Sequence, residues 1–204
     1  MESISIKNLI FSHTMLAPSE LPKISKKLAN LAYAISLPKP LKILDKVNLS
    51  LEKGDMLCIS GKSGEGKSSL LRVIAGLEKA QSGEISLFGE PIKQGDWTAL
   101  SMAQKGIGFV FQNNALISDL TVKDNIAVPL RYHNMGTEEE IEQKVDRALL
   151  LMLARSFAND YPYSLSLGIR KRVAIARSWA LDAKILLLDE PTAGLDKTSR
   201  DNLL

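Results

Sequence analysis

Hydrophobic and polar positions follow two periods along this chain. Apolar residues at every second position, or in short unbroken runs, predict β-strands. These strands are expected at residues 3–11, 42–51, 56–60, 84–88, 106–111 and 185–188. Apolar residues at intervals of three and four predict one helix after residue 67 and another after residue 137. The second helix also has a capping box, Thr137–Glu140, at its start.

Two of the apolar runs are predicted to be buried strands. Met56–Ser60 leads into a glycine-rich loop, and Ile185–Leu188 consists of four consecutive aliphatic residues. Such a run suits a strand of a parallel sheet that is covered on both faces. Cys58, the single cysteine, lies in the first run, and we expect a reduced and buried thiol.

Residues 16–40 depart from this pattern because they contain four prolines. Between the prolines, Ile24, Leu28, Leu31 and Ile35 recur at helical spacing beside several lysines. We interpret the segment as an insertion with a short helix that packs on the domain by its apolar stripe. The alternative is a basic amphipathic segment that touches the membrane or a membrane partner.

Composition narrows the functional classes. The 204 residues are 45% hydrophobic and 24% charged, which is typical of one globular domain over residues 1–204. The net charge of +3 gives no reason to expect nucleic acid as a partner. No apolar run reaches the roughly 20 residues that span a bilayer. We therefore expect a cytoplasmic chain that reaches a membrane only through a partner.

The segment Gly61–Ser68 reads GKSGEGKS and fits the phosphate-loop pattern G-x-x-x-x-G-K-[ST]. Glycines in such a loop let backbone N–H groups converge on phosphate oxygens, and the following helix adds the positive end of its dipole. Lys67 is expected at the β- and γ-phosphates, Ser68 at magnesium and Ser69 at the α-phosphate. The predicted nucleotide-binding residues are Gly61, Lys62, Ser63, Gly64, Glu65, Gly66, Lys67, Ser68 and Ser69.

Two carboxylates follow the aliphatic run Ile185–Leu188. Asp189 is predicted to hold magnesium directly or through water, and Glu190 to polarise the attacking water. A hydrophobic run that ends in Asp-Glu is a weak signal by itself. Downstream of a phosphate loop it becomes a strong one.

Between these motifs, Leu165–Arg177 reads LSLGIRKRVAIAR and resembles the signature segment of ATP-binding cassette (ABC) ATPases. The resemblance covers nearly the whole chain outside residues 16–40. It implies an α/β P-loop NTPase fold of the ABC ATPase type. That fold has a mainly parallel central sheet, an antiparallel β subdomain and a helical signature subdomain at about residues 113–180. It also implies ATP and Mg²⁺ as ligands.

The resemblance implies roles for further residues. Gln112 resembles the glutamine of the family's Q-loop, which contacts magnesium and water and senses the permease. Ser166 and Gly168 resemble the signature donors that cap the γ-phosphate held by an opposite protomer. The segment departs from the usual LSGGQ because Leu167 replaces a glycine and Ile169 a glutamine. Thr192–Asp196 resembles the D-loop, which crosses the dimer interface in the family.

Two expectations concern the ends of the cassette. Family members stack an aromatic side chain on adenine, and His13 takes that place by local resemblance, while Tyr33 competes by its distance from the phosphate loop. The family's switch histidine follows the catalytic glutamate by roughly thirty residues, beyond Leu204. Either the protein is truncated, or its cassette lacks that residue and the final strands. In both cases the 204-residue chain by itself is expected to bind Mg-ATP and to hydrolyse it slowly.

The stretch Phe111–His133 resembles the equivalent stretch in ATPases that serve MCE-type lipid transporters such as the Mla phospholipid system. Ile169 and the basic residues after it also resemble the signature segments of those ATPases. Lipoprotein-export and cell-division cassettes are the runner-up. The resemblance implies a homodimer, an integral-membrane permease and an MCE-type lipid-binding protein as partners. A nucleotide-binding subunit with little hydrolysis is the competing class.

Overall fold

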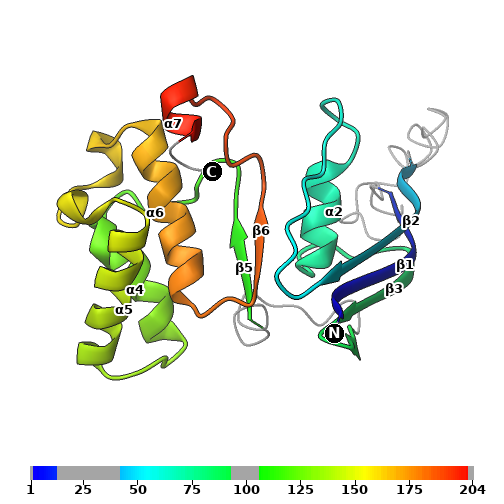
Figure 1. Cartoon of the computed structure of the whole chain (residues 1–204), viewed down its shortest axis with the longest axis horizontal. Helices are drawn as coiled ribbons and strands as arrows, with labels where there is room; N and C mark the ends of the chain where they lie inside the picture. Colours follow the sequence, from blue (N-terminus) through cyan, green and yellow to red (C-terminus); the bar gives the residue numbers. More distant parts are fainter. Residues whose placement is uncertain (1, 13–41, 93–105, 202–204) are drawn as a thin grey trace, which may run out of the picture. The chain divides into compact units, whose positions relative to one another are not determined.

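The computed structural model describes residues 2–12, 42–92 and 106–201. The chain divides into two compact units, residues 1–96 and 97–204, and each has a sheet of its own (Figure 1). His13, Tyr33 and the segment 16–40 lie outside the described residues, so the expectations for them remain predictions.

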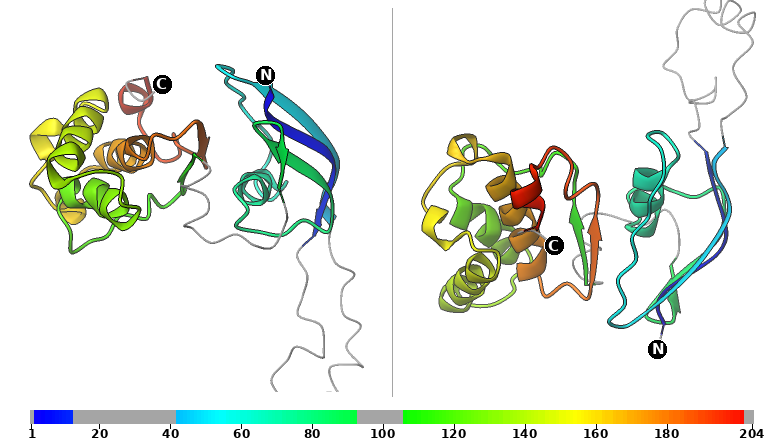
Figure 2. Two further views of the ribbon diagram at one scale, coloured as in Figure 1. Left: turned by 90° about the horizontal axis from the view of Figure 1, so that it is seen from below. Right: turned by 45° about the horizontal axis from the view of Figure 1, so that its top comes forward.

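The first unit contains a four-stranded antiparallel sheet in the order β2-β1-β3-β4 (Figure 2). Ile4 and Ile6 of β1 are buried on one face, and the alternation then shifts so that Leu9 is buried as well. Asn8 causes this shift, because its φ of 51° interrupts the register with both neighbouring strands. The strands are β1 (Glu2–Ser12), β2 (Lys42–Glu52), β3 (Ser82–Leu87) and β4 (Glu90–Pro91).

One helix of the first unit, α2 (Lys67–Ile74), follows the phosphate loop and lies beside this sheet (Figure 2). Its residues Leu70, Val73 and Ile74 are buried, at the spacing of one helix face. The helix ends at Ala75, followed by Gly76 with a φ of 74°, the left-handed conformation that often ends helices.

In the second unit, α6 lies between a pair of strands and two further helices (Figure 1). The strands β5 (Ile107–Val110) and β6 (Ile185–Leu188) are parallel. The helices α4 (Val122–Tyr132), α5 (Glu138–Leu151) and α6 (Leu167–Ala180) all fall within residues 113–180. Two 3-10 turns, η1 (Arg155–Phe157) and η2 (Pro162–Ser164), precede α6, and α7 (Lys197–Asp201) follows β6.

The core of the second unit lies between these three helices. Val122, Ile126 and Leu130 of α4 are fully buried. They belong to one cluster with Leu149 of α5 and Val173 of α6. Burying side chains of this size contributes about 1.5–3 kcal/mol each. The helical layer therefore supplies the rigid support for α6.

The predicted capping box is confirmed at the start of α5. The backbone N–H of Glu140 donates to the Thr137 hydroxyl at 3.3 Å, and the Thr137 N–H donates to the Glu140 carboxylate at 2.7 Å. These two bonds satisfy donors that have no partner within the helix.

The predicted buried strand over Met56–Ser60 is wrong. The segment belongs to neither sheet of the described residues, Met56 is 95% exposed and Cys58 is exposed. An apolar run forms a strand only where a neighbouring strand pairs with its N–H and C=O groups, and the sequence pattern does not specify that partner. Likewise β6 is not covered on both faces, since Leu186 is 38% exposed.

Within the described ranges 2–12, 42–92 and 106–201, none of the helices combines the length and the apolar character needed to cross a bilayer.

Candidate functional site

The phosphate loop turns sharply before α2. Gly64 and Gly66 have φ values of 84° and 89°, and Gly66 is the residue that caps α2. A Cβ on Gly66 would lie 2.4 Å from Cγ2 of Ile43, whereas a Cβ at Gly64 would meet no atom within 4 Å. Glycine is thus required at position 66 both by the backbone angle and by the approach of β2, while the surface at Gly64 is open.

Side chains of the loop hold it in a closed turn. The Lys67 ammonium donates to the carbonyl oxygens of Gly61 and Lys62 at 2.9 and 2.7 Å. The Lys62 backbone N–H donates to the Glu65 carboxylate at 2.8 Å. All these partners lie within six residues of each other, so the loop is stabilised locally.

The start of α2 suits an anion. The first turn of the helix contains no acidic residue. Ser69 is buried at 8% exposure, while Ser68 is half-buried at the helix start. Free backbone N–H groups and the dipole give this end of a helix a partial positive charge, to which the Lys67 ammonium adds. The donor set therefore fits the phosphates of a nucleotide.

In the second unit, residues far apart in sequence meet where β5 and β6 end. The Gln112 side-chain amide donates to the Glu190 carboxylate at 2.7 Å, although the two residues are 78 positions apart. The Asp189 N–H donates to the Val110 carbonyl oxygen at 2.9 Å, and Asp189 is only 3% exposed. Parallel strands end at the same edge of a sheet, so Gln112 after β5 lies beside the carboxylates after β6.

Lys171 of α6 joins this group, although no individual role was predicted for it. Its ammonium donates to the Glu190 carbonyl oxygen at 2.9 Å, and the residue is 2% exposed. Burial lowers the pKa of the Lys171 amine, and the negative charge of Glu190 raises it to a smaller extent. We refer to Gln112, Lys171, Asp189 and Glu190 as the Glu190 centre.

A sequence signal for Lys171 did exist. Lys171 precedes Ala174 and Ser178 by three and seven positions, and both of these residues are buried. A lysine at helical spacing with buried residues lies on the inner face of its helix. The buried side of α6 therefore carries a cation where an apolar residue is the rule.

Two further side chains tie α6 to β5 and to the segment that follows Gln112. Arg177 donates to the carbonyl oxygens of Asn114 and Ala115 at 3.0 and 2.8 Å. Ser178 donates to the Phe109 carbonyl oxygen at 3.1 Å. The helix thus holds β5, the two residues Asn114 and Ala115, and Glu190.

The signature segment begins α6. The Ser166 hydroxyl caps the helix by accepting from the Ile169 N–H at 3.4 Å, and Gly168 lies in its first turn. Leu167, which replaces a glycine of the usual pattern, lies against the glycine of the predicted D-loop: its Cδ2 is 3.0 Å from where a Cβ on Gly194 would be. Gly194 has no side chain, and this leaves room for Leu167.

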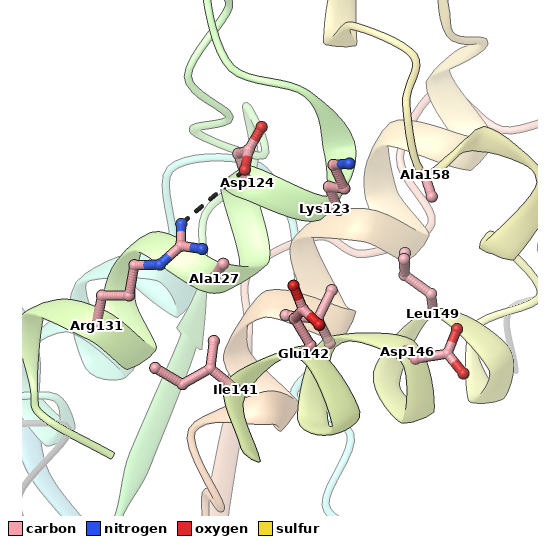
Figure 3. A pocket seen from close by; sticks show the side chains of 10 residues that line it. Lys123, Asp124, Ala127, Arg131, Ile141, Glu142, Asp146, Leu149 and Ala158 are labelled. Carbon is pink, nitrogen blue, oxygen red and sulfur yellow. Dashed lines mark ion pairs between the residues drawn. The ribbon is translucent and has the colours of Figure 1, made fainter. Parts of the chain in front are cut away.

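The second unit also has a pocket of about 410 Å³ between α4 and α5 (Figure 3). Arg131 and Asp124, both from α4, line it, with Nη1 and Oδ1 4.0 Å apart. None of the predicted nucleotide, magnesium or catalytic residues lines this pocket. The candidate functional residues of the first unit are therefore those of the phosphate loop. Those of the second unit are the Glu190 centre and the start of the signature segment.

A comparison with protein families matches residues 44–193 to the family described as ABC transporter. This range includes the phosphate loop, Gln112, the signature segment and both carboxylates after β6.

Three curated relatives with similar sequences are named as sulfate/thiosulfate import ATP-binding proteins. The chain is 45% identical over 160 residues to the probable sulfate/thiosulfate import ATP-binding protein CysA of Chlorella vulgaris, and the match covers 78% of this chain and 65% of the relative. It is 45% identical over 163 residues to the CysA protein of Mannheimia succiniciproducens, with 78% and 44% covered. For CysA of Pseudomonas aeruginosa the identity is 42%, with 79% and 49% covered. The chain thus spans about half to two thirds of the length of these relatives.

Solved structures match the fold. A dimeric post-hydrolysis state of the ATP-binding cassette MJ0796 bound to ADP and Pi is 30% identical, with a TM-score of 0.77 over 98% of this chain and 79% of the other. A second dimeric structure of MJ0796, a bacterial ABC transporter cassette, gives a TM-score of 0.76 with the same identity and coverage.

The predicted fold class is therefore confirmed, as is the family-level prediction of ATP and Mg²⁺ as ligands. With its family match over residues 44–193 and its cassette fold, this chain belongs to the ABC transporter family as an ATP-binding domain.

Proposed function

We propose that this chain is the ATP-binding and ATP-hydrolysing subunit of an ABC transporter and that it drives a membrane permease. The phosphate loop carries the proposal. Gly64 and Gly66 turn the loop at positive φ, and Lys67 lies at the start of α2 with its ammonium over the loop. Loops of this geometry at a helix N-terminus bind phosphate groups.

The residues present fit a magnesium nucleotide. Residues Gly61 to Ser69 would surround the phosphates, and Ser68, Gln112 and Asp189 would hold the ion. Magnesium prefers oxygen donors and retains several waters, so a few protein oxygens are sufficient. When bound, the ion neutralises negative charge on the phosphates.

Glu190 is the proposed general base. Its carboxylate accepts a hydrogen bond from Gln112 at 2.7 Å and so has a defined direction. A carboxylate so placed can take the proton of an attacking water at Oε1 or Oε2. The start of α6, with Ser166 and Gly168, would bind the γ-phosphate held by a second copy. The dimeric cassettes among the solved structures support this arrangement.

Binding and turnover can be tested on the purified chain. We expect labelled ATP to bind, and phosphate to be released only when Mg²⁺ is supplied. Binding without measurable release, with or without the permease, would favour the class of nucleotide-binding subunits with little hydrolysis. Absence of binding would contradict the proposal itself.

We further propose that the permease imports an inorganic oxyanion of the sulfate or thiosulfate type, because the curated relatives are named for that import. In this proposal the chain lies on the inner face of the membrane through its permease. Lipid transport with an MCE-type partner is the second candidate. It rests on the resemblance of the stretch Phe111–His133, on Ile169 in place of the signature glutamine and on the basic residues that follow Ile169. The relatives named above do not support it.

Uptake of labelled sulfate distinguishes the two candidates. A bacterial strain without its own sulfate-import ATPase would be supplied with this chain and its permease. Restored uptake that is lost in the Lys67→Ala variant supports oxyanion import. The lipid candidate would be favoured if the supplied chain did not raise sulfate uptake above that of the deficient strain but did change the exchange of phospholipid between membranes.

A further inference from the structure

We propose that Lys171 is a positioning residue for Glu190: it holds the main chain of Glu190 from the signature helix and thereby fixes the direction of the Glu190 carboxylate. This inference rests on the proposed function, in which Glu190 is the general base. Lys171 itself is not expected to touch the nucleotide.

The backbone of Glu190 needs such support. Its φ is 50°, a left-handed conformation that is uncommon for a residue with a side chain. The Glu190 carbonyl oxygen accepts from the Lys171 ammonium at 2.9 Å and from the Ala193 N–H at 3.2 Å. These two donors hold the peptide group that follows the Glu190 side chain, and an unusual backbone conformation persists when its surroundings fix it in this way.

A purely structural role does not explain a lysine at this position. Lys171 is 2% exposed, and burying an ammonium group is costly unless it is paired. An apolar side chain of similar length would fill the same space beside Ala174 and Ser178 without that cost. The charge of Glu190 partly offsets the effect of burial on the Lys171 pKa, so the two groups interact electrostatically.

The position of Lys171 on α6 links the signature segment to Glu190. Leu167, the first residue of α6, precedes Lys171 by four positions, which is about one helical turn. A movement of the signature end of α6 would therefore reach the main chain of Glu190 directly through the Lys171 side chain. In the proposed dimer, closure on the nucleotide of the partner would change the position of Glu190 within the same chain.

The test compares Lys171→Met with Lys171→Arg in the full chain, with Lys144→Met as the matched control. Lys144 is a lysine of α5 that pairs with Asp182 at 2.7 Å, away from the Glu190 centre. We expect Lys171→Met to lower kcat for Mg-ATP about 10–100-fold, the size expected for a misplaced catalytic group, with KM unchanged. Lys171→Arg, which keeps charge and donors, should recover most of kcat, and Lys144→Met should match the wild type.

A double-mutant cycle separates positioning from general damage. If Lys171 acts through Glu190, adding Lys171→Met to Glu190→Gln should lower the residual rate no further. A full additive loss would overturn the proposal, as would a wild-type kcat in Lys171→Met. If Lys171→Met does not fold, Lys171→Gln replaces it. A lowered kcat with unchanged KM then supports the proposal, and wild-type kinetics overturn it.

A measurement without ATP separates this inference from the proposed function. Acetylation of lysine amines in the wild-type chain, read by mass spectrometry, should be much slower at Lys171 than at the exposed Lys79. Equal rates would overturn the contact with Glu190 whatever the ATPase assay shows. If Lys171 is protected but the wild-type chain does not hydrolyse ATP, the proposed function fails and the contact remains.

Discussion

The phosphate loop and the Glu190 centre are stabilised in different ways. In the loop, the side-chain bonds of Lys67 and Glu65 reach partners three to six residues away, and the loop residues up to Glu65 are exposed. In the Glu190 centre, Gln112 and Lys171 reach Glu190 from 78 and 19 residues away, and Lys171 and Asp189 are buried. The loop is thus formed by its own sequence, whereas the geometry around Glu190 depends on the packing of β5, β6 and α6.

The largest effect is expected in the Glu190 centre. Glu190→Gln should keep ATP binding but lower the hydrolysis rate about 10²–10⁴-fold, because the proposed general base is lost. Phosphate release measures the rate, and light scattering with ATP should reveal a trapped dimer. Glu142→Gln, the same change on the exposed surface of α5, is the control. Hydrolysis at the parental rate in Glu190→Gln would refute the role.

In the phosphate loop, Lys67→Ala should weaken ATP binding rather than turnover alone. The substitution removes the ammonium that spans Gly61 and Lys62 and would contact the phosphates. A hydrogen bond to a charged group contributes about 1.5–3 kcal/mol, or roughly a 10–100-fold change in affinity. Equilibrium binding of labelled ATP checks this, with Lys79→Ala as the control. Unchanged affinity would remove the loop from the nucleotide site.

Asn125 extends the comparison to the helical layer, where one buried side chain holds a loop through bonds that span four to eight residues. Its side chain accepts from the Ile117 N–H at 2.8 Å and donates to the carbonyl oxygens of Ile117, Leu120 and Thr121 at 3.0–3.1 Å. Asn125→Ala removes the acceptor of the Ile117 N–H and one donor to each of the three carbonyl oxygens, so the free energy of unfolding should fall by about 1–3 kcal/mol. Urea unfolding measures it, with Gln143→Ala as an exposed amide control. If the free energy of unfolding changed no more than in the control, the Asn125 bonds would not stabilise the loop.

The smallest expected effect concerns pH. Burial lowers the pKa of Lys171 from its usual 10.5. In the pH range just below 10.5 the unfolded chain therefore binds more protons at this site than the folded chain does, and stability rises with pH. The wild type should gain stability relative to Lys171→Met as the pH rises through this range. Melting temperatures of both proteins across that range provide the measurement, and a constant difference would argue against a buried amine.

Predictability from sequence follows the same division. The loop residues Gly61–Ser68 and the capping box Thr137–Glu140 were predictable because their bonds join near neighbours in the chain. The contact of Lys171 with Glu190 was not predictable, because it depends on the packing of α6 against the end of β6. The prediction of a strand at Met56–Ser60 was wrong for a related reason. The composition of this segment favours a strand, but strand pairing depends on another part of the chain.

The contact between Leu167 and Gly194 has an evolutionary consequence. A Cβ at Gly194 would lie 3.0 Å from the Leu167 side chain, and Gly194 also has a φ of 74°. While leucine stands at position 167, selection should hold glycine at position 194, although 27 positions separate the two. A lineage that regained glycine at 167 would lose one of the two constraints on position 194. A residue other than glycine at position 194 is therefore expected only in chains that have a smaller residue than leucine at position 167.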